Sequence, residues 1–285
     1  RNEPVARWIQ RQSAGAARLV HVGRPWAPLQ AWDLIVTTGQ YFLPERDNIV
    51  HNALPLHQFA GHDLEVAAQQ LQPQVAGLPG PRIAVLVGGN SGKFVFTADK
   101  GMQMGELVNR LAVAVGGSLI LTDSPRTPVA AMDALLGQLT APNLSHRCDS
   151  NADNPYRGML ALADAFVVTG ESMSMLSEAA GRGKPLFVFD LGDSDSPWWL
   201  LPHSFGYKPL THRIAMLLGP ARMRRDISRI QDNLVATGRA NWLTQEAIAR
   251  LGSELPAMQG LDTGQTSVSA ADLQRAVTAV NKLFS

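Results

Sequence analysis

A glycine-rich stretch in the middle of the chain has the composition of a phosphate-binding loop. Gly88, Gly89, Asn90, Ser91 and Gly92 follow directly after an apolar run at residues 82–87. Glycines let backbone N–H groups approach a phosphate, and Asn and Ser side chains can donate hydrogen bonds to it. The stretch is neither G-x-G-x-x-G nor a Walker A loop, because no Lys-Ser/Thr pair follows it.

A second stretch, at residues 161–191, reads as strand, helix and strand. Residues 165–169 are apolar and β-rich, Gly170 breaks the run, and Ser172 or Ser174 can cap the helix that we expect to reach about residue 182. A βαβ unit of this kind places a helix N-terminus at the carboxyl edge of a parallel sheet. The free N–H groups and positive dipole end there favour an anion or a nucleotide.

The expected helix carries a glutamate that packing does not explain. If the helical spacing begins at Glu171, then this residue, Ser174 and Glu178 share one face of the helix. A carboxylate one turn along a phosphate-binding helix can accept hydrogen bonds from a ribose diol. The alternative is that Glu178 is a solvated surface residue.

Two further candidates follow other predicted elements. Arg126 and Thr127 come after the strand at residues 118–122, where an Arg can hold a phosphate bidentately. The alternative for Arg126 is a surface ion pair with Asp123. Tyr156 begins a predicted helix, and its ring can stack on a base.

Three polar residues near the start of the chain form a weaker group. Arg24 lies in a Gly-Arg-Pro turn, and His51 and Asn52 precede the predicted linker. They either contact a ligand or satisfy loop backbone groups. A zinc site there lacks a spaced third ligand.

No nucleophile with a matching base is recognisable. Gly170 to Ser174 lacks the final Gly of G-x-S-x-G, and Cys148 with His146 reads as an incidental loop pair. No catalytic residue and no metal ligand is therefore assigned.

Strands and helices alternate in the order needed to position these side chains, which favours a parallel α/β fold. The Pro- and Gly-rich segment at 72–81 is the expected linker between two such halves. Strands are expected at 18–22, 34–37, 49–50, 82–87, 118–122, 165–169 and 186–191, and helices at 3–12, 62–71, 100–115 with Thr97 as cap, 128–139, 155–163, 212–218, 226–234, 242–251 and 269–283, with a mobile loop at 252–268.

Composition narrows the class of protein. The chain has 285 residues, 45% hydrophobic and 17% charged, with a net charge of +1 and one cysteine. This length suggests two domains, and the near-zero charge gives no global signature of nucleic-acid binding. No apolar run reaches the ~18 residues of a membrane span. The chain begins with Arg1 in what reads as mid-helix, so we expect an upstream segment.

Taken together, the motifs resemble the plant "elongated mitochondria" fission family and its bacterial relatives, which are described as glycosyltransferases or loosely as nucleoside-diphosphate-sugar epimerases. The resemblance covers roughly residues 4–235. It rests on residues 22–25, 33–38, 51–57, 88–92, 124–128, 154–156 and 168–179.

The resemblance implies a GT-B-type fold, with two Rossmann-like domains facing across a cleft. It implies an acceptor-side domain at 1–72 that lacks its N-terminal part, a nucleotide-sugar domain at 82–235, and C-terminal helices at 236–285 packing back across both. In the similar enzyme that adds GlcNAc to the peptidoglycan lipid precursor, a glycine loop meets the diphosphate and a helix Glu binds the ribose. The matching positions here are Gly88 to Gly92 and Glu178.

The implied activity is a metal-independent glycosyltransferase that uses a nucleoside-diphosphate sugar, UDP-type by preference, in bacterial cell-envelope glycan synthesis. The implied acceptor is a glycan or lipid-linked molecule near Arg24, His51 and Asn52. The expected location is the cytoplasm, with peripheral contact to the inner membrane near Arg222, Arg224 and Arg225. The alternative is a non-catalytic adaptor with the same fold, as the plant relatives imply. An epimerase is disfavoured, because no Tyr-x-x-x-Lys pair follows a glycine fingerprint.

Overall fold

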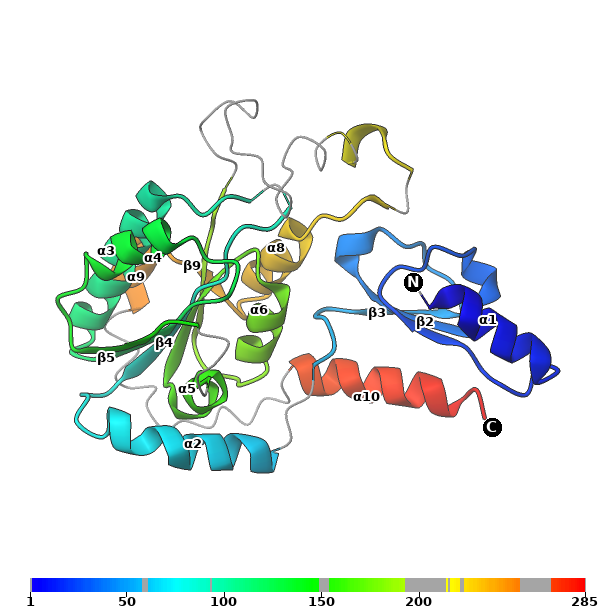
Figure 1. Ribbon diagram of the computed structural model, residues 1–285, viewed down its shortest axis with the longest axis horizontal. Helices are drawn as coiled ribbons and strands as arrows, with labels where there is room; N and C mark the ends of the chain where they lie inside the picture. Colours follow the sequence, from blue (N-terminus) through cyan, green and yellow to red (C-terminus); the bar gives the residue numbers. More distant parts are fainter. Residues whose placement is uncertain are drawn as a thin grey trace.

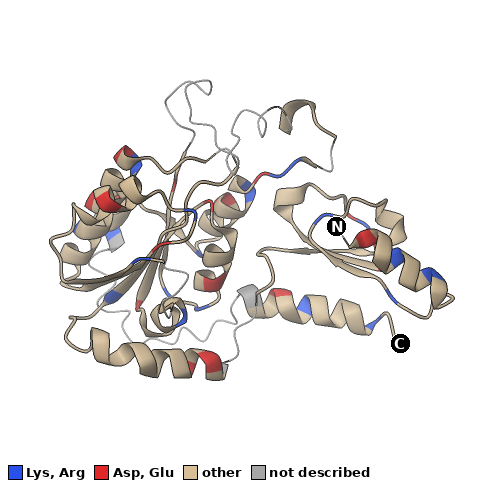
Figure 2. Cartoon of the chain, in the orientation of Figure 1, with Lys and Arg blue, Asp and Glu red and all other residues tan. Residues whose placement is uncertain are grey.

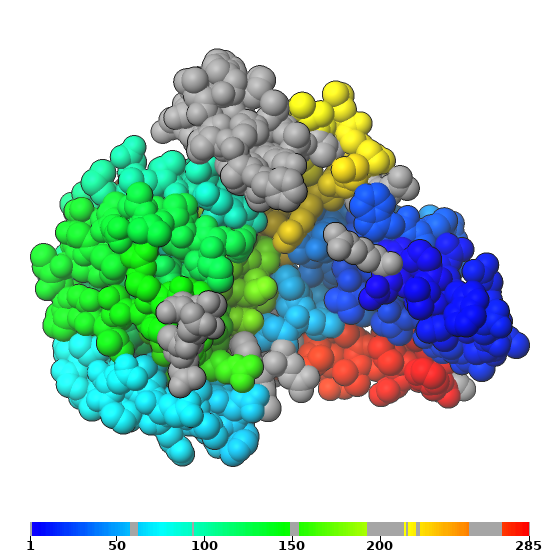
Figure 3. Space-filling view, viewed as in Figure 1, coloured from blue at the N-terminus to red at the C-terminus, as the bar shows by residue number. Residues whose placement is uncertain are grey.

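The computed structural model describes residues 2–57, 61–92, 94–148, 154–192, 214, 216–220, 223–251 and 268–284. These residues form two parallel β-sheets, one of three strands and one of six, with helices packed against them (Figure 1). The predicted parallel α/β class is confirmed. Figure 3 shows the N-terminal residues (blue) and the green residues of the larger sheet in separate lobes, with the C-terminal residues (red) along the blue lobe.

The smaller sheet is built from the first strands of the chain. Its order is β1 (Val20–Val22), β2 (Leu34–Thr38) and β3 (Ile49–Asn52), all parallel. Because side chains alternate along a strand, β2 presents apolar residues to both faces. A central strand of this kind must be covered on both sides.

Helices from opposite ends of the chain contribute to the two covers. Ile35 of β2 packs in a cluster that includes Ala6 of α1 (Glu3–Gln12). Leu34 and Val36, on the other face, pack against Ala276 of α10 (Val268–Asn281). The last helix of the chain therefore completes the core of the first sheet.

The larger sheet has the strand order β6-β5-β4-β7-β8-β9, with all neighbours parallel. The connections change direction between β4 and β7, and ligands of open α/β sheets bind beyond the strand ends at such a switch point. The strands are β4 (Arg82–Leu86), β5 (Ser118–Thr122), β6 (Asn143–His146), β7 (Ala165–Thr169), β8 (Leu186–Phe189) and β9 (Asn241–Trp242).

Helices cover the larger sheet. Hydrogen bonds at the start of two of them confirm two predicted helix starts: Thr97 Oγ1 accepts the Lys100 N–H at 3.3 Å, and Asn154 Oδ1 accepts the Tyr156 N–H at 2.9 Å. The helices are α2 (Gly61–Val75), α3 (Ala98–Ala114), α4 (Val129–Leu136), α5 (Tyr156–Leu162), α6 (Met173–Ala180), α8 (Ser228–Ala236) and α9 (Gln245–Leu251).

The expected helix end at residue 71 is wrong. Helix α2 continues through Pro73 to Val75, because Leu71 and Val75 are both buried and extend its apolar stripe. The helix packs against α5 and therefore lies with the larger sheet. The domain boundary expected after residue 72 stays a prediction. The packing of α2 against α5, however, groups residues 61–75 with the larger sheet.

Both edge strands of the larger sheet escaped sequence analysis. Strand β6 has the polar sequence Asn-Leu-Ser-His, with Asn143 and Ser145 exposed, so it lacks the apolar pattern of a buried strand. Trp242, expected to begin a helix, instead pairs with Val188 in β9, and α9 begins three residues later. Because an edge strand has a hydrogen-bonded neighbour on one side only and is less covered, its sequence is less apolar than that of a central strand.

Some expected elements fall on residues that are not described. The loop after Leu191 lies from residue 193 onward outside the described chain, as do most of the expected helix at 212–218 and the expected loop at 252–268. Helix α10 agrees closely with the helix expected at 269–283.

Gly101 provides a test of the packing between α3 and α4. A Cβ atom there would overlap the carbonyl oxygen of Ala131. We expect Gly101→Ala to lower the free energy of unfolding by about 1–3 kcal/mol through overpacking, although Ala is the better helix former. Urea unfolding measures this, with Gly77→Ala as control because nothing lies within 4 Å of its Cβ position. Equal stability of both variants would contradict the close approach.

Candidate functional site

The glycine loop lies at the switch point, but its first two amides already have partners. The Gly88 N–H donates to Thr169 Oγ1 at 2.7 Å, and the Gly89 N–H donates to Glu171 Oε1 at 2.5 Å. Both acceptors come from the end of β7, 81 and 82 residues later in the chain. A carboxylate thus occupies the position in which a phosphate contact was expected.

Two further amides of the loop also bond within the protein. The Asn90 N–H donates to the Arg126 carbonyl at 3.2 Å, and the Ser91 N–H donates to the Phe94 carbonyl at 3.1 Å. Thr127 Oγ1 donates to the carbonyl of Gly88. The loops after β4, β5 and β7 therefore interlock at one edge of the sheet. Gly92, with φ of 57°, lies in the turn between Ser91 and Phe94, which exchange backbone hydrogen bonds.

Close packing explains two of the glycines. A Cβ at Gly89 would overlap the carbonyl of Arg126, and one at Gly88 would overlap the Glu171 carboxylate. Glycine is required here for loop-on-loop contact. Whether the loop also binds a diphosphate stays a prediction, and such a ligand would have to replace Glu171 at the Gly89 amide.

Glu171 is the least expected member of this cluster. It is 3% exposed and lies in the turn before α6, so the expectation that it shares a helix face with Ser174 and Glu178 is wrong. Its Oε2 atom is buried with no hydrogen-bond partner in the described chain. Burial raises the pKa of Glu171 to about 7, although the Gly89 N–H and the charge of Arg126 oppose the shift.

Arg126 does not pair with Asp123. Arg147 takes that carboxylate, with its Nε 3.0 Å from Asp123 Oδ2, and the Cys148 N–H donates to Oδ1. Arg126 is exposed beside the glycine loop and donates to the Asn90 carbonyl at 3.4 Å. The interpretation of Arg126 as a surface partner of Asp123 is therefore wrong, and its guanidinium faces the switch-point loops.

Glu178 and Tyr156 contact each other directly. The Tyr156 hydroxyl donates to Glu178 Oε2, joining the start of α5 to the end of α6. Burial raises the pKa of both groups. Glu178 is half-buried, so the interpretation of it as a freely solvated surface residue is wrong.

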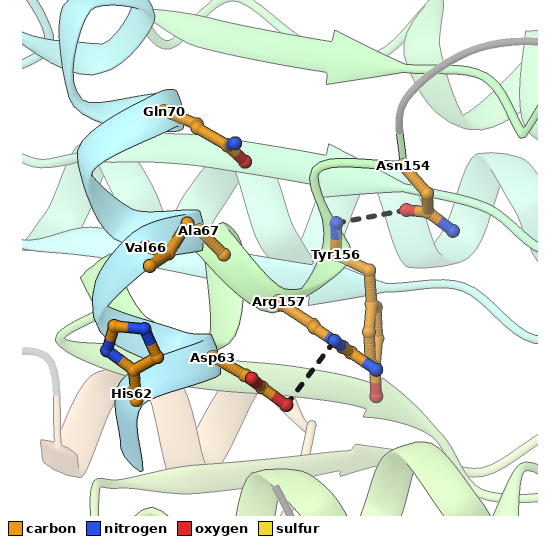
Figure 4. Close-up of a pocket in the computed structure, with 8 residues that line it drawn as sticks. All are labelled: His62, Asp63, Val66, Ala67, Gln70, Asn154, Tyr156 and Arg157. Atoms are coloured by element: carbon orange, nitrogen blue, oxygen red, sulfur yellow. Dashed lines mark hydrogen bonds and ion pairs between the residues drawn. The ribbon is translucent and has the colours of Figure 1, made fainter. Parts of the chain in front are cut away.

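Tyr156 also lines a groove of about 640 Å³ between α2 and α5. Figure 4 shows its walls, with an ion pair between Arg157 and Asp63 at 3.7 Å across the floor. Such a volume lies in the range of small-molecule sites. The lining residues are His62, Asp63, Val66, Ala67, Gln70, Asn154, Tyr156 and Arg157.

A second cavity, of about 250 Å³, lies between the two sheets. One wall is the carboxyl edge of the smaller sheet and the other is the N-terminus of α6. In Figure 1, α6 lies on the side of the larger sheet that is nearer to the smaller one. We call it the cleft cavity. Its lining residues are Val22, Gly23, Val36, Thr37, Thr38, Gln40, Tyr41, Asn52, Leu54, Pro55, Leu56, Met173, Ser174 and Arg225.

The α6 wall of the cleft cavity has a positive character. Ser172, the N-cap residue of α6, makes no side-chain hydrogen bond to the first N–H groups of the helix. The Gly170 carbonyl accepts Gln231 Nε2 at 2.6 Å, which fixes the turn that begins the helix. An uncapped helix N-terminus favours an anion.

Arg225 adds a positive charge to the same cavity. Its Nε donates to Gln40 Oε1 at 2.8 Å, and its guanidinium lies 5.9 Å from the centre of the Tyr41 ring. The segment leading into α8 carries the basic residues coloured blue beside the smaller sheet in Figure 2. Arg225 lines the cleft cavity and is exposed, and Arg222 lies outside the described residues. The expected contact of Arg222, Arg224 and Arg225 with a membrane stays a prediction.

Of the three acceptor-side candidates, only Asn52 lines the cleft cavity. Arg24 donates instead to the carbonyl of Tyr41. His51 Nε2 lies 3.6 Å from Glu45 Oε1 at the outer surface. Sequence analysis missed Thr37 in the cavity lining, because a threonine within a buried strand carries no local signal of a ligand.

Two features are absent from the described part of the chain. None of its helices is both long and apolar enough to cross a bilayer. Nor do three or more His, Cys, Asp or Glu side chains gather there in an arrangement suited to a metal ion.

Glu171 predicts a pH dependence of stability. Because its pKa is raised, the folded protein holds a proton that the unfolded chain releases above its ordinary pKa of 4.5. The resulting stabilisation is complete below pH 4.5 and is lost as the pH rises through about 7. Between pH 5 and 8 we expect the free energy of unfolding to fall on the order of 2 kcal/mol further in wild type than in Glu171→Gln.

Urea unfolding at both pH values measures the difference. Glu106→Gln is the matched control, because Glu106 is exposed on α3 and should reproduce the wild-type dependence. Parallel pH curves for wild type and Glu171→Gln would contradict a protonated Glu171.

Comparison with known proteins places the chain in a family. The sequence profile described as "Mitochondrial fission ELM1" matches residues 1–199. The mitochondrial fission protein ELM1 of Arabidopsis thaliana is 28% identical over 207 residues, which cover 65% of this chain and 48% of that protein. The uncharacterized protein RP120 of Rickettsia prowazekii is 33% identical over 108 residues, covering 37% of this chain and 30% of that protein.

Both matches span half or less of the relatives' own length. Among solved structures, a glycosyltransferase from Rickettsia africae aligns over 98% of this chain and 76% of its own, with 11% identity and a TM-score of 0.41. A TM-score this low decides neither fold nor activity. Since the family profile covers well over half of the 285 residues, as the motifs predicted, the chain belongs to the mitochondrial fission ELM1 family.

Proposed function

We propose that this chain binds a nucleoside-diphosphate sugar and acts as a metal-independent glycosyltransferase. The observation that carries the proposal is the placement of α6. Its uncapped N-terminus opens on the cleft cavity through Ser174, and its last turn carries the half-buried Glu178. One helix thereby offers an anion site and a diol acceptor.

The spacing along α6 suits a nucleotide. Ser174 and Glu178 are four residues apart, a rise of about 6 Å, so a diphosphate at the N-terminus leaves the adjoining ribose beside the carboxylate. The Tyr156 hydroxyl already orients Glu178 by donating to Oε2. The groove between α2 and α5, at about 640 Å³, offers the base a place against the Tyr156 ring.

Charge offset in the cleft supports a reaction without a metal. The leaving diphosphate gains negative charge as the glycosidic bond breaks, and preorganised positive groups stabilise it. The α6 dipole and Arg225 supply that charge at the cleft cavity. Arg126 supplies a second guanidinium beside the glycine loop. There the ligand would have to displace Glu171 from the Gly89 N–H.

The acceptor in this proposal lies against the smaller sheet, on the opposite wall of the cleft. A glycan or lipid-linked acceptor of the cell envelope, a UDP-type donor and a cytoplasmic, membrane-peripheral location are the expectations of the resemblance, and they stay part of the proposal. No side chain in the cleft is assigned as the catalytic base.

One observation favours the adaptor alternative. Val5, Trp8 and Ile9 lie on α1 with 58%, 55% and 48% of their surface exposed, an apolar stripe that suits a protein partner. The family description, mitochondrial fission, agrees with an adaptor role. An adaptor needs no nucleotide, so nucleotide binding separates the two hypotheses.

Calorimetric titration with UDP, GDP and CDP tests the donor site. We expect one of them to bind, and Glu178→Ala to weaken it about 10- to 100-fold, because hydrogen bonds to a charged group contribute about 1.5–3 kcal/mol. Glu106→Ala, an exposed helix glutamate far in sequence, is the control and should bind as wild type does.

Failure of all three nucleotides to bind the folded protein would reject the donor site. The same protein should then be tested for partner capture with Trp8→Ala, which removes the centre of the exposed α1 stripe.

A further inference from the structure

We propose that Glu171 is a built-in competitor for an anion site on the glycine loop, so that a phosphate group binds the Gly88 and Gly89 amides only when the Glu171 side chain leaves them. This inference rests on the proposed function, whose donor carries a diphosphate. It adds what controls the access of that diphosphate to the loop.

Two successive N–H groups of the glycine loop point at the end of β7. The Gly88 N–H donates to Thr169 Oγ1 at 2.7 Å, and the Gly89 N–H donates to Glu171 Oε1 at 2.5 Å. Both acceptor oxygens lie in the space that a Cβ atom on Gly88 would fill. Successive backbone N–H groups that face one point form a concave anion site. A hydroxyl and a carboxyl of the same chain therefore occupy an arrangement that suits an anion.

The hold of Glu171 on this site is incomplete. The residue is 3% exposed, yet its Oε2 atom has no hydrogen-bond partner among the described residues. A buried oxygen of this kind loses its hydrogen bonds to water and gains none in return. Glu171 lies in the turn between β7, which ends at Thr169, and α6, which begins at Met173. Its side chain can therefore rotate outward without unwinding a turn of helix.

Arg126 favours a phosphate over the carboxyl at this place. Its guanidinium is exposed beside the glycine loop, donates to the Asn90 carbonyl at 3.4 Å, and acts through its charge on the Glu171 carboxyl. A phosphate group has more oxygens than a carboxylate and a larger charge. It can accept from the Gly89 amide and from the guanidinium at once.

Displacement of Glu171 should also release a proton. Burial raises the pKa of Glu171 to about 7, and the displaced, solvated side chain returns to its ordinary pKa of 4.5. Below pH 7 a bound anion thus expels a proton to solvent, and anion binding weakens as the pH falls. Among the described residues, Arg126 is the charged group that acts on Glu171. The other groups packed against it, from Gly88, Gly89 and Thr169, are neutral.

The experiment measures sulfate binding to the full chain by calorimetry at constant ionic strength. Sulfate has the shape of a phosphate group and stays fully ionised between pH 6 and 8. At pH 8 we expect Glu171→Ala to bind sulfate about 10- to 100-fold more tightly than wild type, because a hydrogen bond to a charged group no longer competes. Adding Arg126→Ala should reverse this gain. Adding Arg182→Ala, which removes an exposed arginine beyond the end of α6, should leave it unchanged.

Glu171→Gln separates occupation of the site from the charge of the occupant. Its amide oxygen can still accept the Gly89 N–H, so this variant should bind sulfate far less tightly than Glu171→Ala does. Wild type should bind sulfate about tenfold more weakly at pH 6 than at pH 8, and Glu171→Gln should lack that change. The pH comparison decides the matter even where urea unfolding shows that Glu171→Ala does not fold.

Three results would overturn the competitor: no gain in folded Glu171→Ala, an equal gain in Glu171→Gln, or the same pH dependence in wild type and Glu171→Gln. An equal gain would mean that the Glu171 charge acts from a distance on another anion site. Nucleotide binding through Glu178 without a sulfate gain rejects the competitor and leaves the donor site standing. A sulfate gain without nucleotide binding supports the competitor and rejects the nucleotide donor.

Discussion

A buried carboxylate at the switch point of the larger sheet organises the loops around it. Glu171 accepts the Gly89 N–H and lies against Gly88, so it joins the ends of β4 and β7. The same glycines contact the loop after β5, because Gly89 lies against the Arg126 carbonyl and the Gly88 carbonyl accepts from Thr127 Oγ1. Because a buried charge is costly without partners, burial raises the pKa of this carboxyl to about 7. The Glu171 side chain occupies the place at the glycine loop where a phosphate was expected, and any phosphate that enters competes with it for the Gly89 N–H.

The second constraint is long-range, between the last helix and the first sheet. Helix α10 buries one face of β2, and Asp272 and Arg275 hold the backbone on either side of Asn52. A sheet of three strands is too small to bury its own two faces, so it depends on this helix for a core. The position of one wall of the cleft is consequently set by residues more than two hundred positions away.

These two constraints leave the cleft cavity with complementary walls. The α6 side is positive, through an uncapped N-terminus and Arg225, and the smaller sheet contributes Asn52, whose side-chain amide has no hydrogen-bond partner among the described residues. Such a pair of walls suits a ligand with an anionic end and a polyhydroxyl end. Membership of the mitochondrial fission ELM1 family does not by itself choose between a transferase and an adaptor, since one fold serves many functions.

The sequence by itself determined the parallel α/β class, the family, the cap at Thr97 and the location of the glycine loop and α6 at strand ends. The family rests on the resemblance of several motifs, whereas the other three follow from periodicity and local turn chemistry, which neighbouring residues decide. It did not determine that Glu171 would occupy the loop, that Tyr156 would hold Glu178, or that Arg147 rather than Arg126 would take Asp123. Only the tertiary structure decided those pairings, and the unpaired state of Thr37 and Asn52, because a polar group's burial and partner depend on residues distant in sequence.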